Sequence, residues 1–129
     1  MTDTTATTAE ELVRAGRLVA IIRVPRLTPT DAVSLTEILV ESGVLALEFT
    51  LTSEGALAAV EAAAEAAGDR AAVGVGTVLA EDEVRAAADA GARFVVSPNV
   101  SPAVIGRAER LGLLALPGAY LWLRDRRYR

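Results

Sequence analysis

The stretch VLALEFTLTS, residues 44–53, has the alternating pattern of a buried β-strand but carries a carboxylate in its middle. Successive side chains of a strand point to opposite faces of the sheet. One face would carry Leu45, Leu47, Phe49 and Leu51, and the other Ala46, Glu48, Thr50 and Thr52. A large apolar face opposite a small, polar face is typical of the inside of a (β/α)8 barrel, so Glu48 is predicted to point into the lumen. A carboxylate placed there needs partners, a raised pKa or a wet cavity, because desolvating its ionised form is costly.

The same strand belongs to a repeat of strands and helices along the chain. Apolar runs predict strands at 18–24, 45–51, 72–75, 94–96 and 113–116, and helical segments that close on glycine are predicted at 9–16, 28–43, 53–68, 80–91 and 101–112. Thr28 and Ser101 are predicted N-caps, each followed by a first-turn proline. Strands that alternate with helices at this spacing predict a parallel sheet with right-handed crossovers.

The predicted fold class is therefore α/β, as a partial (β/α)8 TIM barrel of about four βα units plus a fifth strand, with a short N-terminal helix. A complete barrel takes eight units and about 250 residues, so the 129 residues supply roughly half of one. An open doubly wound sheet fits the same alternation, although its strands would tend to be apolar throughout. We expect a disordered N-terminus over 1–8, the barrel domain over 9–119 and a divergent Arg-rich tail over 120–129.

The composition limits the chemistry that this chain can perform. It is 52% hydrophobic with a net charge of -4, which argues against nucleic acid as the main partner. It has no Cys and no His, so proton transfer near neutral pH falls to a perturbed carboxylate, a Tyr or an amine. All thirteen basic residues are Arg. No apolar run approaches the length of a membrane span and the first residues lack a signal-peptide pattern, so we expect a soluble, cytoplasmic protein.

Five motifs in register resemble one known family. They are IIRV (21–24), LEFTLTSEGAL (47–57), VGVGTVL (73–79), GARFVVSPN (91–99) and LALPGAY (114–120). Together they resemble the N-terminal part of the 2-keto-3-deoxy-6-phosphogluconate (KDPG) aldolases, also called 2-dehydro-3-deoxy-phosphogluconate/4-hydroxy-2-oxoglutarate aldolases. The resemblance implies a class I aldolase on a (β/α)8 barrel, usually homotrimeric, that cleaves its substrate to pyruvate and glyceraldehyde 3-phosphate. A Lys on the sixth strand forms a Schiff base in that family, and a Glu on the second strand shuttles protons.

The resemblance assigns two charged residues to the predicted site. Glu48 matches the proton-shuttling Glu, and the alternative is a salt bridge to Arg23 across neighbouring strands. Arg23 matches an Arg that some members use to bind the substrate carboxylate, and the alternative is a surface Arg at a strand end. Other members of the family carry this Arg shortly after the Glu, where this chain has Thr52.

Further site residues follow from the other motifs. Gly74, Gly76 and Thr77 would let a ligand approach the backbone at a strand end, with the Thr hydroxyl free to hydrogen-bond; packing glycines are the alternative. Pro98 matches a Pro that lines the pyruvate pocket in the family, although a lone Pro more often ends a strand. The acidic run 81–83 is interpreted as first-turn helix charge and not as a metal site, and no cofactor is expected.

The last residues depart from the family pattern. The segment LWLRDRRYR, residues 121–129, follows PGAY, and neither the Schiff-base Lys nor any other Lys is present. We expect a truncation or a changed reading frame, with a basic tail as the alternative. Arg cannot replace the Lys, because its guanidinium stays protonated and is a poor nucleophile.

Three functional interpretations therefore remain open from the sequence. The first is an aldolase-family chain that is inactive alone, and the second is a half that needs a C-terminal partner or self-association. The third is a non-enzymatic half barrel that binds a small molecule, such as a pyruvate-type keto acid, or a protein, or that has no role. A phosphate-binding barrel of the thiamine phosphate synthase type is a further alternative, which explains LEFTLT less well.

Overall fold

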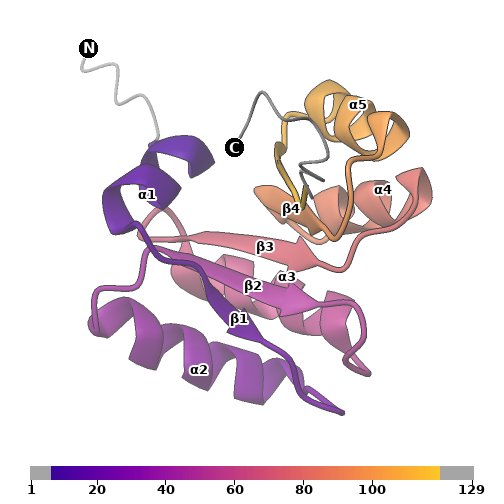
Figure 1. Ribbon diagram of the computed structural model, residues 1–129. Helices are drawn as coiled ribbons and strands as arrows, with labels where there is room; N and C mark the ends of the chain where they lie inside the picture. Colours follow the sequence, from indigo (N-terminus) through magenta and orange to yellow (C-terminus); the bar gives the residue numbers. More distant parts are fainter. Residues whose placement is uncertain (1–6, 120–129) are drawn as a thin grey trace, which may run out of the picture.

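The computed structural model describes residues 7–119, and these form one curved parallel sheet with its helices (Figure 1). In chain order the elements are α1 (Ala9–Gly16), β1 (Ala20–Ile22), α2 (Pro29–Glu41), β2 (Ala46–Thr50), α3 (Ala56–Ala67), β3 (Ala72–Gly76), α4 (Glu81–Asp89), β4 (Phe94–Ser97), α5 (Pro102–Arg110) and β5 (Leu114–Pro117). The predicted tail over 120–129 and residues 1–6 of the predicted disordered start lie outside the described residues. The predicted alternation of strands and helices is confirmed.

The five strands lie in the order β1-β2-β3-β4-β5, and every neighbouring pair is parallel. Consecutive strands are therefore spatial neighbours, as in a (β/α)8 barrel. Helices α2 to α5 pack on one face, where the larger core cluster joins their apolar residues to Leu47, Phe49, Val73, Val75 and Val95. The alternative of a doubly wound sheet is wrong, because that fold has crossover helices on both faces.

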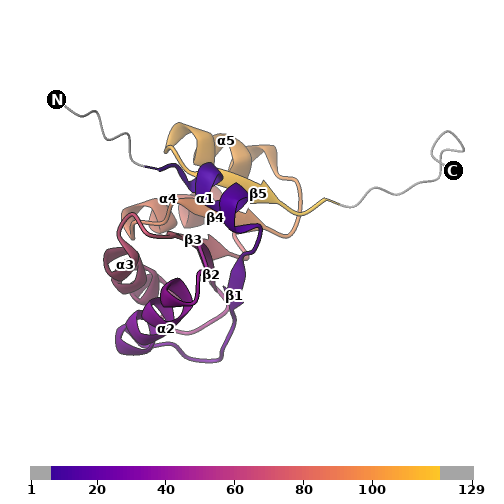
Figure 2. The ribbon, with the colours of Figure 1, turned by 90° about the vertical axis from the view of Figure 1, so that its left-hand side faces the viewer.

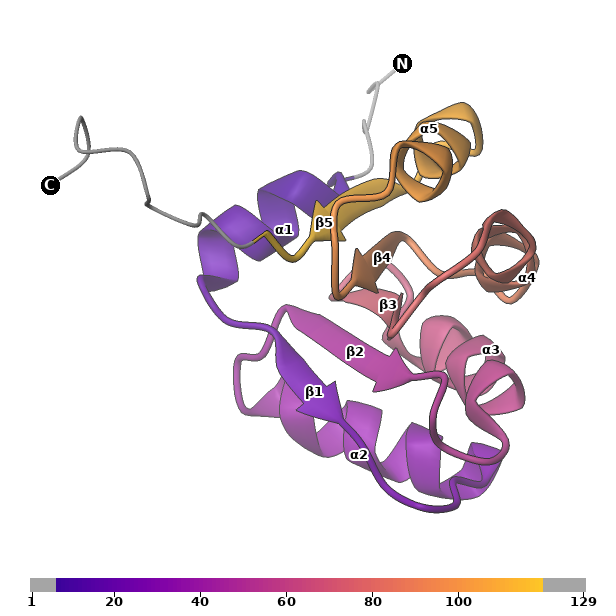
Figure 3. The same ribbon diagram turned by 45° about the vertical axis from the view of Figure 1, so that its right-hand side comes forward.

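The other face of the sheet is concave and is closed at one end by α1 (Figure 3). Ala9 and Leu12 of α1 pack against residues at the amino-terminal ends of the strands, including Ala46, Ala72 and Phe94. In Figure 2 α1 lies beside β5 and apart from α2 and α3. The carboxyl ends of the strands are left uncovered by this helix.

The helix ends follow the predicted signals closely. Thr28 and Ser101 cap α2 and α5, accepting from the backbone N–H of Asp31 and Val104 at 3.1 and 3.4 Å. Four glycines, at positions 43, 68, 91 and 112, were predicted to end the helices α2, α3, α4 and α5, and all four have positive φ. The predicted N-cap signals and helix-ending glycines are therefore confirmed.

Three boundaries differ from the prediction. Thr8, which we placed in the polar start, caps α1 and accepts from the Glu11 backbone N–H at 3.1 Å. At its other end α1 stops at Gly16, as predicted, and Arg17 is its C-cap with a φ of 55°. Strand β1 is shorter than 18–24 because the chain after it turns to bond the loop after β2, and α3 begins only after Gly55, whose φ is 84°.

Candidate functional site

Glu48 lies in the middle of β2 on the concave face. Its register partners are Ile21 on β1 and Gly74 on β3. The flanking residues Leu47 and Phe49 are buried in the cluster under the helices, so strand alternation turns Glu48 away from them. Only 4% of the residue is exposed. The predicted orientation of this carboxylate is therefore found in the structure.

A glycine on the neighbouring strand makes room for the Glu48 side chain. The carboxylate leans toward the carboxyl end of the sheet and lies over Gly76, where a Cβ atom would collide with its Oε1. Position 76 is a glycine because the Glu48 carboxylate occupies the space that a side chain there would need. Gly74 fits the alternative of a packing glycine, since a Cβ there would collide with the Phe94 ring.

Burial raises the pKa of the Glu48 carboxyl above its usual value of 4.5, and the positive charge of Arg23 opposes that rise. The desolvation of the carboxylate is the larger effect. Among residues 7–119, neither the side-chain hydrogen bonds nor the ion pairs within 4.0 Å include the Glu48 carboxylate. The alternative of a direct salt bridge to Arg23 is absent from this part of the chain.

Arg23 follows the last residue of β1 at the same edge of the sheet. Ile21 is the register partner of Glu48, and Arg23 is two positions further, so strand alternation places it on the concave side. The residue is exposed. Its positive charge acts on Glu48, and no ion pair within 4.0 Å among residues 7–119 includes its guanidinium.

The remaining predicted residues follow the carboxyl ends of their strands. Thr77 comes directly after β3 and has a φ of 60°, a left-handed conformation that is unusual for a β-branched residue. Thr52 and Pro98 are exposed after β2 and β4. Because all strands are parallel, these residues meet at the same edge as Arg23 and Gly76.

Two polar residues at this edge were missing from the predicted site. Thr50 is fully buried, and its hydroxyl lies 2.9 Å from that of Thr52. Ser53 is also buried, and its hydroxyl accepts a hydrogen bond from the Val24 N–H at 3.2 Å. The alternation of LEFTLTS places Thr50 on the face of Glu48, whereas the Ser53 contact depends on a loop path that sequence does not specify.

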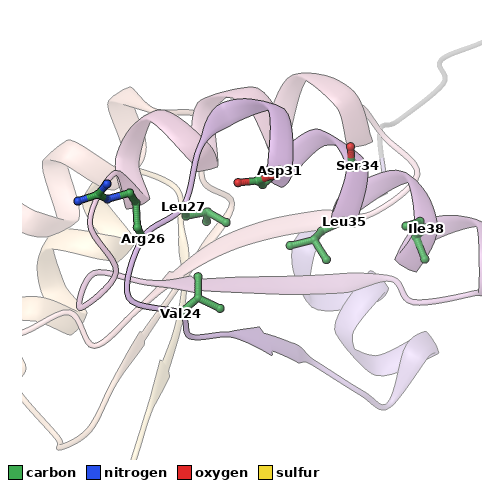
Figure 4. Close-up of a pocket in the computed structure, with 7 residues that line it drawn as sticks. All are labelled: Val24, Arg26, Leu27, Asp31, Ser34, Leu35 and Ile38. Carbon is green, nitrogen blue, oxygen red and sulfur yellow. The ribbon is translucent and has the colours of Figure 1, made fainter.

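A hollow in the described part of the chain lies away from these residues. It is about 380 Å³ in volume and lies between α2 and the segment after β1, with Val24, Leu27, Leu35 and Ile38 as its apolar lining (Figure 4). Glu48 does not contribute to it. We place the chemistry at the strand ends nevertheless, because a concave sheet face that opens to solvent is not an enclosed hollow, and the perturbed carboxylate lies there.

The acidic run 81–83 behaves as first-turn helix charge. Glu83 accepts from the Leu79 N–H at 2.6 Å, and Glu81 pairs with Arg110 at 3.2 Å. Residues 7–119 contain no cluster of three or more His, Cys, Asp or Glu that could hold a metal ion. Within the same range, no helix is long and apolar enough to cross a membrane.

A model of the family described as "Aldolase: KDPG and KHG aldolase" matches residues 9–121. The chain belongs to this aldolase family. The match agrees with the resemblance predicted from the five motifs, and it favours that resemblance over the thiamine phosphate synthase type of barrel. The matched residues include all five strands of the sheet and Glu48 on its concave face.

Curated relatives of this aldolase-family chain agree with the match. A probable 2-dehydro-3-deoxy-6-phosphogalactonate aldolase of Rhizobium meliloti (strain 1021) is 39% identical over 103 residues, which are 80% of this chain and 48% of the relative. The KHG/KDPG aldolase of Escherichia coli (strain K12) is 35% identical over 112 residues, 87% of this chain and 51% of the relative. The chain therefore spans about half the length of the curated relatives it matches.

A solved aldolase structure confirms the partial barrel. The KDPG aldolase of Legionella pneumophila, with pyruvate captured at low pH as a covalent carbinolamine intermediate, superposes with a TM-score of 0.73 at 26% identity. The match covers 86% of this chain and 52% of that one. The five-stranded sheet thus corresponds to about half of a TIM-barrel aldolase.

Proposed function

We propose that this chain carries the proton-transferring half of a class I aldolase site that acts on a 2-keto-3-deoxy-6-phospho sugar acid. The observation that carries the proposal is Glu48, a buried carboxylate without a protein partner among the described residues, beside the open carboxyl ends of parallel strands. The products would be pyruvate and glyceraldehyde 3-phosphate if the substrate is KDPG.

Schiff-base chemistry requires a group that gives and takes protons repeatedly. When an amine adds to the substrate ketone, the resulting carbinolamine loses water only after its hydroxyl is protonated. Cleavage of the C3–C4 bond then needs a base for the C4 hydroxyl proton, and the enamine left behind takes a proton at C3. The raised pKa of Glu48 suits these steps, because such a carboxyl holds its proton at a higher pH than an exposed Glu does.

Arg23 supplies charge for the substrate carboxylate in this proposal. A guanidinium fork matches the two oxygens of a carboxylate, and Arg23 is exposed on the concave side beside Glu48. Thr77 and Thr52 add hydroxyls at the same edge, and Pro98 lines it. A keto acid bound by its carboxylate at Arg23 would present its carbonyl carbon toward the interior of the barrel.

The lysine amine of the proposed Schiff base must come from outside the 129 residues. None of these residues is Lys, and a delocalised, protonated guanidinium does not attack a ketone. We therefore propose that the 129 residues alone form no Schiff base, and that a polypeptide segment corresponding to the other half of the relatives supplies the Lys. The absence of Lys equally favours a second candidate function, in which the half barrel binds pyruvate-type keto acids without cleaving them.

The test is complementation with a Lys-bearing half. The chain is mixed with the C-terminal half of the Escherichia coli relative, and pyruvate release from KDPG is measured, with intact mass after pyruvate and borohydride. We expect activity and a reduced adduct only in the mixture, with the adduct on the partner fragment, and loss of the activity with Glu48→Gln but not with the exposed control Glu61→Gln.

Two other outcomes would decide against the proposal. An adduct on this chain alone would show that it has its own nucleophile. A folded mixture that binds pyruvate but neither cleaves KDPG nor forms an adduct would support the binding function instead.

A further inference from the structure

The loop after β1 is fastened to the loop after β2 by a small set of hydrogen bonds. The Val24 N–H donates to Ser53 Oγ at 3.2 Å, the Glu54 N–H donates to the Pro25 carbonyl at 3.0 Å, and the Leu27 N–H donates to the Glu54 carbonyl at 2.9 Å. An isolated parallel bridge joins residues 26 and 54. We call this set of contacts, between residues 24–27 and 53–54, the loop clamp.

Ser53 is the buried member of the loop clamp. It is 4% exposed, and its own N–H donates to the Thr50 carbonyl at 3.1 Å, so its position is fixed by β2. The Arg26–Glu54 ion pair of the clamp is by contrast widely exposed, with side chains 75% and 70% accessible. Exposed pairs of this kind add little, which leaves the Ser53 hydroxyl as the side-chain contact that matters.

The hydrogen bond that Ser53 Oγ accepts holds the backbone N–H of Val24, the residue after Arg23. Val24 and Arg23 share a peptide unit, so fixing the Val24 N–H also fixes the plane in which the Arg23 carbonyl and backbone lie. Arg23 has no ion pair within 4.0 Å among the described residues to hold its own side chain. Its direction toward the concave face is therefore set through the backbone.

We propose that Ser53 is a positioning residue, whose hydroxyl holds the backbone at Val24 and thereby keeps the Arg23 guanidinium beside Glu48 at the mouth of the site. The inference rests on the proposed function in one respect, that Arg23 there receives the substrate carboxylate. The dependence of the Arg23 position on Ser53 does not require catalysis, so it can be tested on this chain alone.

The test uses the titration of Glu48 as a reporter of the Arg23 position. Arg23 lowers the pKa of Glu48, so an Arg23 that moves away leaves Glu48 with a higher titration midpoint. The Glu48 side-chain carboxyl is followed by carbon-detected NMR over pH in the unchanged chain, in Arg23→Gln, in Ser53→Ala and in the double variant. We expect both single variants to shift the midpoint upward and the double variant to shift it no further than Arg23→Gln does.

Matched variants separate positioning from general stability. Ser53→Thr keeps the hydroxyl and should restore the midpoint of the unchanged chain. Ser42→Ala removes another serine hydroxyl bond, to the Ile38 carbonyl at the end of α2, and should leave the midpoint unmoved. A folded Ser53→Ala chain with an unmoved Glu48 midpoint would overturn the proposal, as would shifts of the two single variants that add in full.

The unchanged chain gives a second measurement in case Ser53→Ala does not fold. The Val24 amide should exchange its hydrogen with solvent much more slowly than an unbonded loop amide, since its partner hydroxyl is buried. Exchange of Val24 as fast as that of an open loop would contradict the proposal. Both readouts are made without substrate, so a failure of complementation leaves them interpretable.

Discussion

At the scale of single residues, Glu48 shows how a charged residue within an apolar strand points to a candidate functional site. Its two neighbours along the chain face the helices, so the strand alternation alone sends its carboxylate to the concave side. Its burial could be predicted from VLALEFTLTS, and its lack of an ion pair among the described residues could not. The lean of the side chain over Gly76 was not predictable either, because it depends on the packing of two strands.

Replacing Glu48 by Gln should stabilise the fold at neutral pH. Burial raises the pKa of Glu48 in the folded chain, so the protonated carboxyl is the form that the fold favours. The folded state keeps its full stability below about pH 4.5 and loses part of it as the pH rises through the folded pKa and the carboxyl ionises. Each unit of that rise corresponds to about 1.4 kcal/mol. Urea unfolding of Glu48→Gln should therefore show a larger free energy of unfolding than the unchanged chain near pH 7, with the difference shrinking toward pH 4.

The exposed Glu61 on α3 provides the control for this measurement. Glu61→Gln should leave the free energy of unfolding nearly unchanged across the same pH range. A Glu48→Gln chain that is less stable than the unchanged chain near pH 7 would show that the ionised carboxylate has a strong partner in the folded protein.

At the scale of elements, β3 shapes the concave face through two glycines, whose missing side chains leave space for those of the neighbouring strands. Gly74 admits the Phe94 ring from β4, and Gly76 admits the Glu48 carboxylate from β2. The motif VGVGTVL predicted a strand with close approach, and the close approach exists. The sequence could not say which neighbour approaches, because that depends on the register of three strands, and in both cases the neighbour is a side chain of the protein.

Substituting Gly76 by Ala should test this arrangement directly. The added methyl group would collide with the Glu48 carboxylate, and overpacking of this kind costs about 1 to 3 kcal/mol. Urea unfolding should show this loss of stability. Gly106→Ala, within α5, meets only the flexible end of Arg110 at 3.5 Å and should gain about 0.5 to 1 kcal/mol. Equal stabilities for the two variants would contradict the close packing at Gly76.

At the scale of the whole molecule, the partial barrel leaves apolar surface and strand edges open. Among residues 7–119, β1 and β5 each have a neighbouring strand on one side only, and Ile21 on β1 and Ile38 on α2 are 60% and 61% exposed. The spacing of the helix-ending glycines and the alternation of the second strand were enough to predict this architecture. The short β1, the late start of α3 and the loop clamp were not predictable, because they involve contacts between residues 28 and 29 positions apart in the sequence.

A charge in the hollow beside α2 should weaken association between copies of the chain. Exposed apolar groups and unpaired strand edges favour contacts between molecules. Ile38→Lys should lower the mass measured by light scattering after size-exclusion chromatography at high protein concentration. Thr30→Lys adds the same charge on the same helix outside the hollow and should have a smaller effect. Equal masses for Ile38→Lys and the unchanged chain would show that this surface takes no part in association.

The strand order β1-β2-β3-β4-β5 repeats the order in which a ribosome makes the strands. Within residues 7–119, each strand after the first therefore pairs with the strand synthesised just before it. The loop closed by each such pairing is a single crossover with its helix, and the entropic cost of closure grows with loop length. Assembly can then proceed in step with translation, one unit at a time.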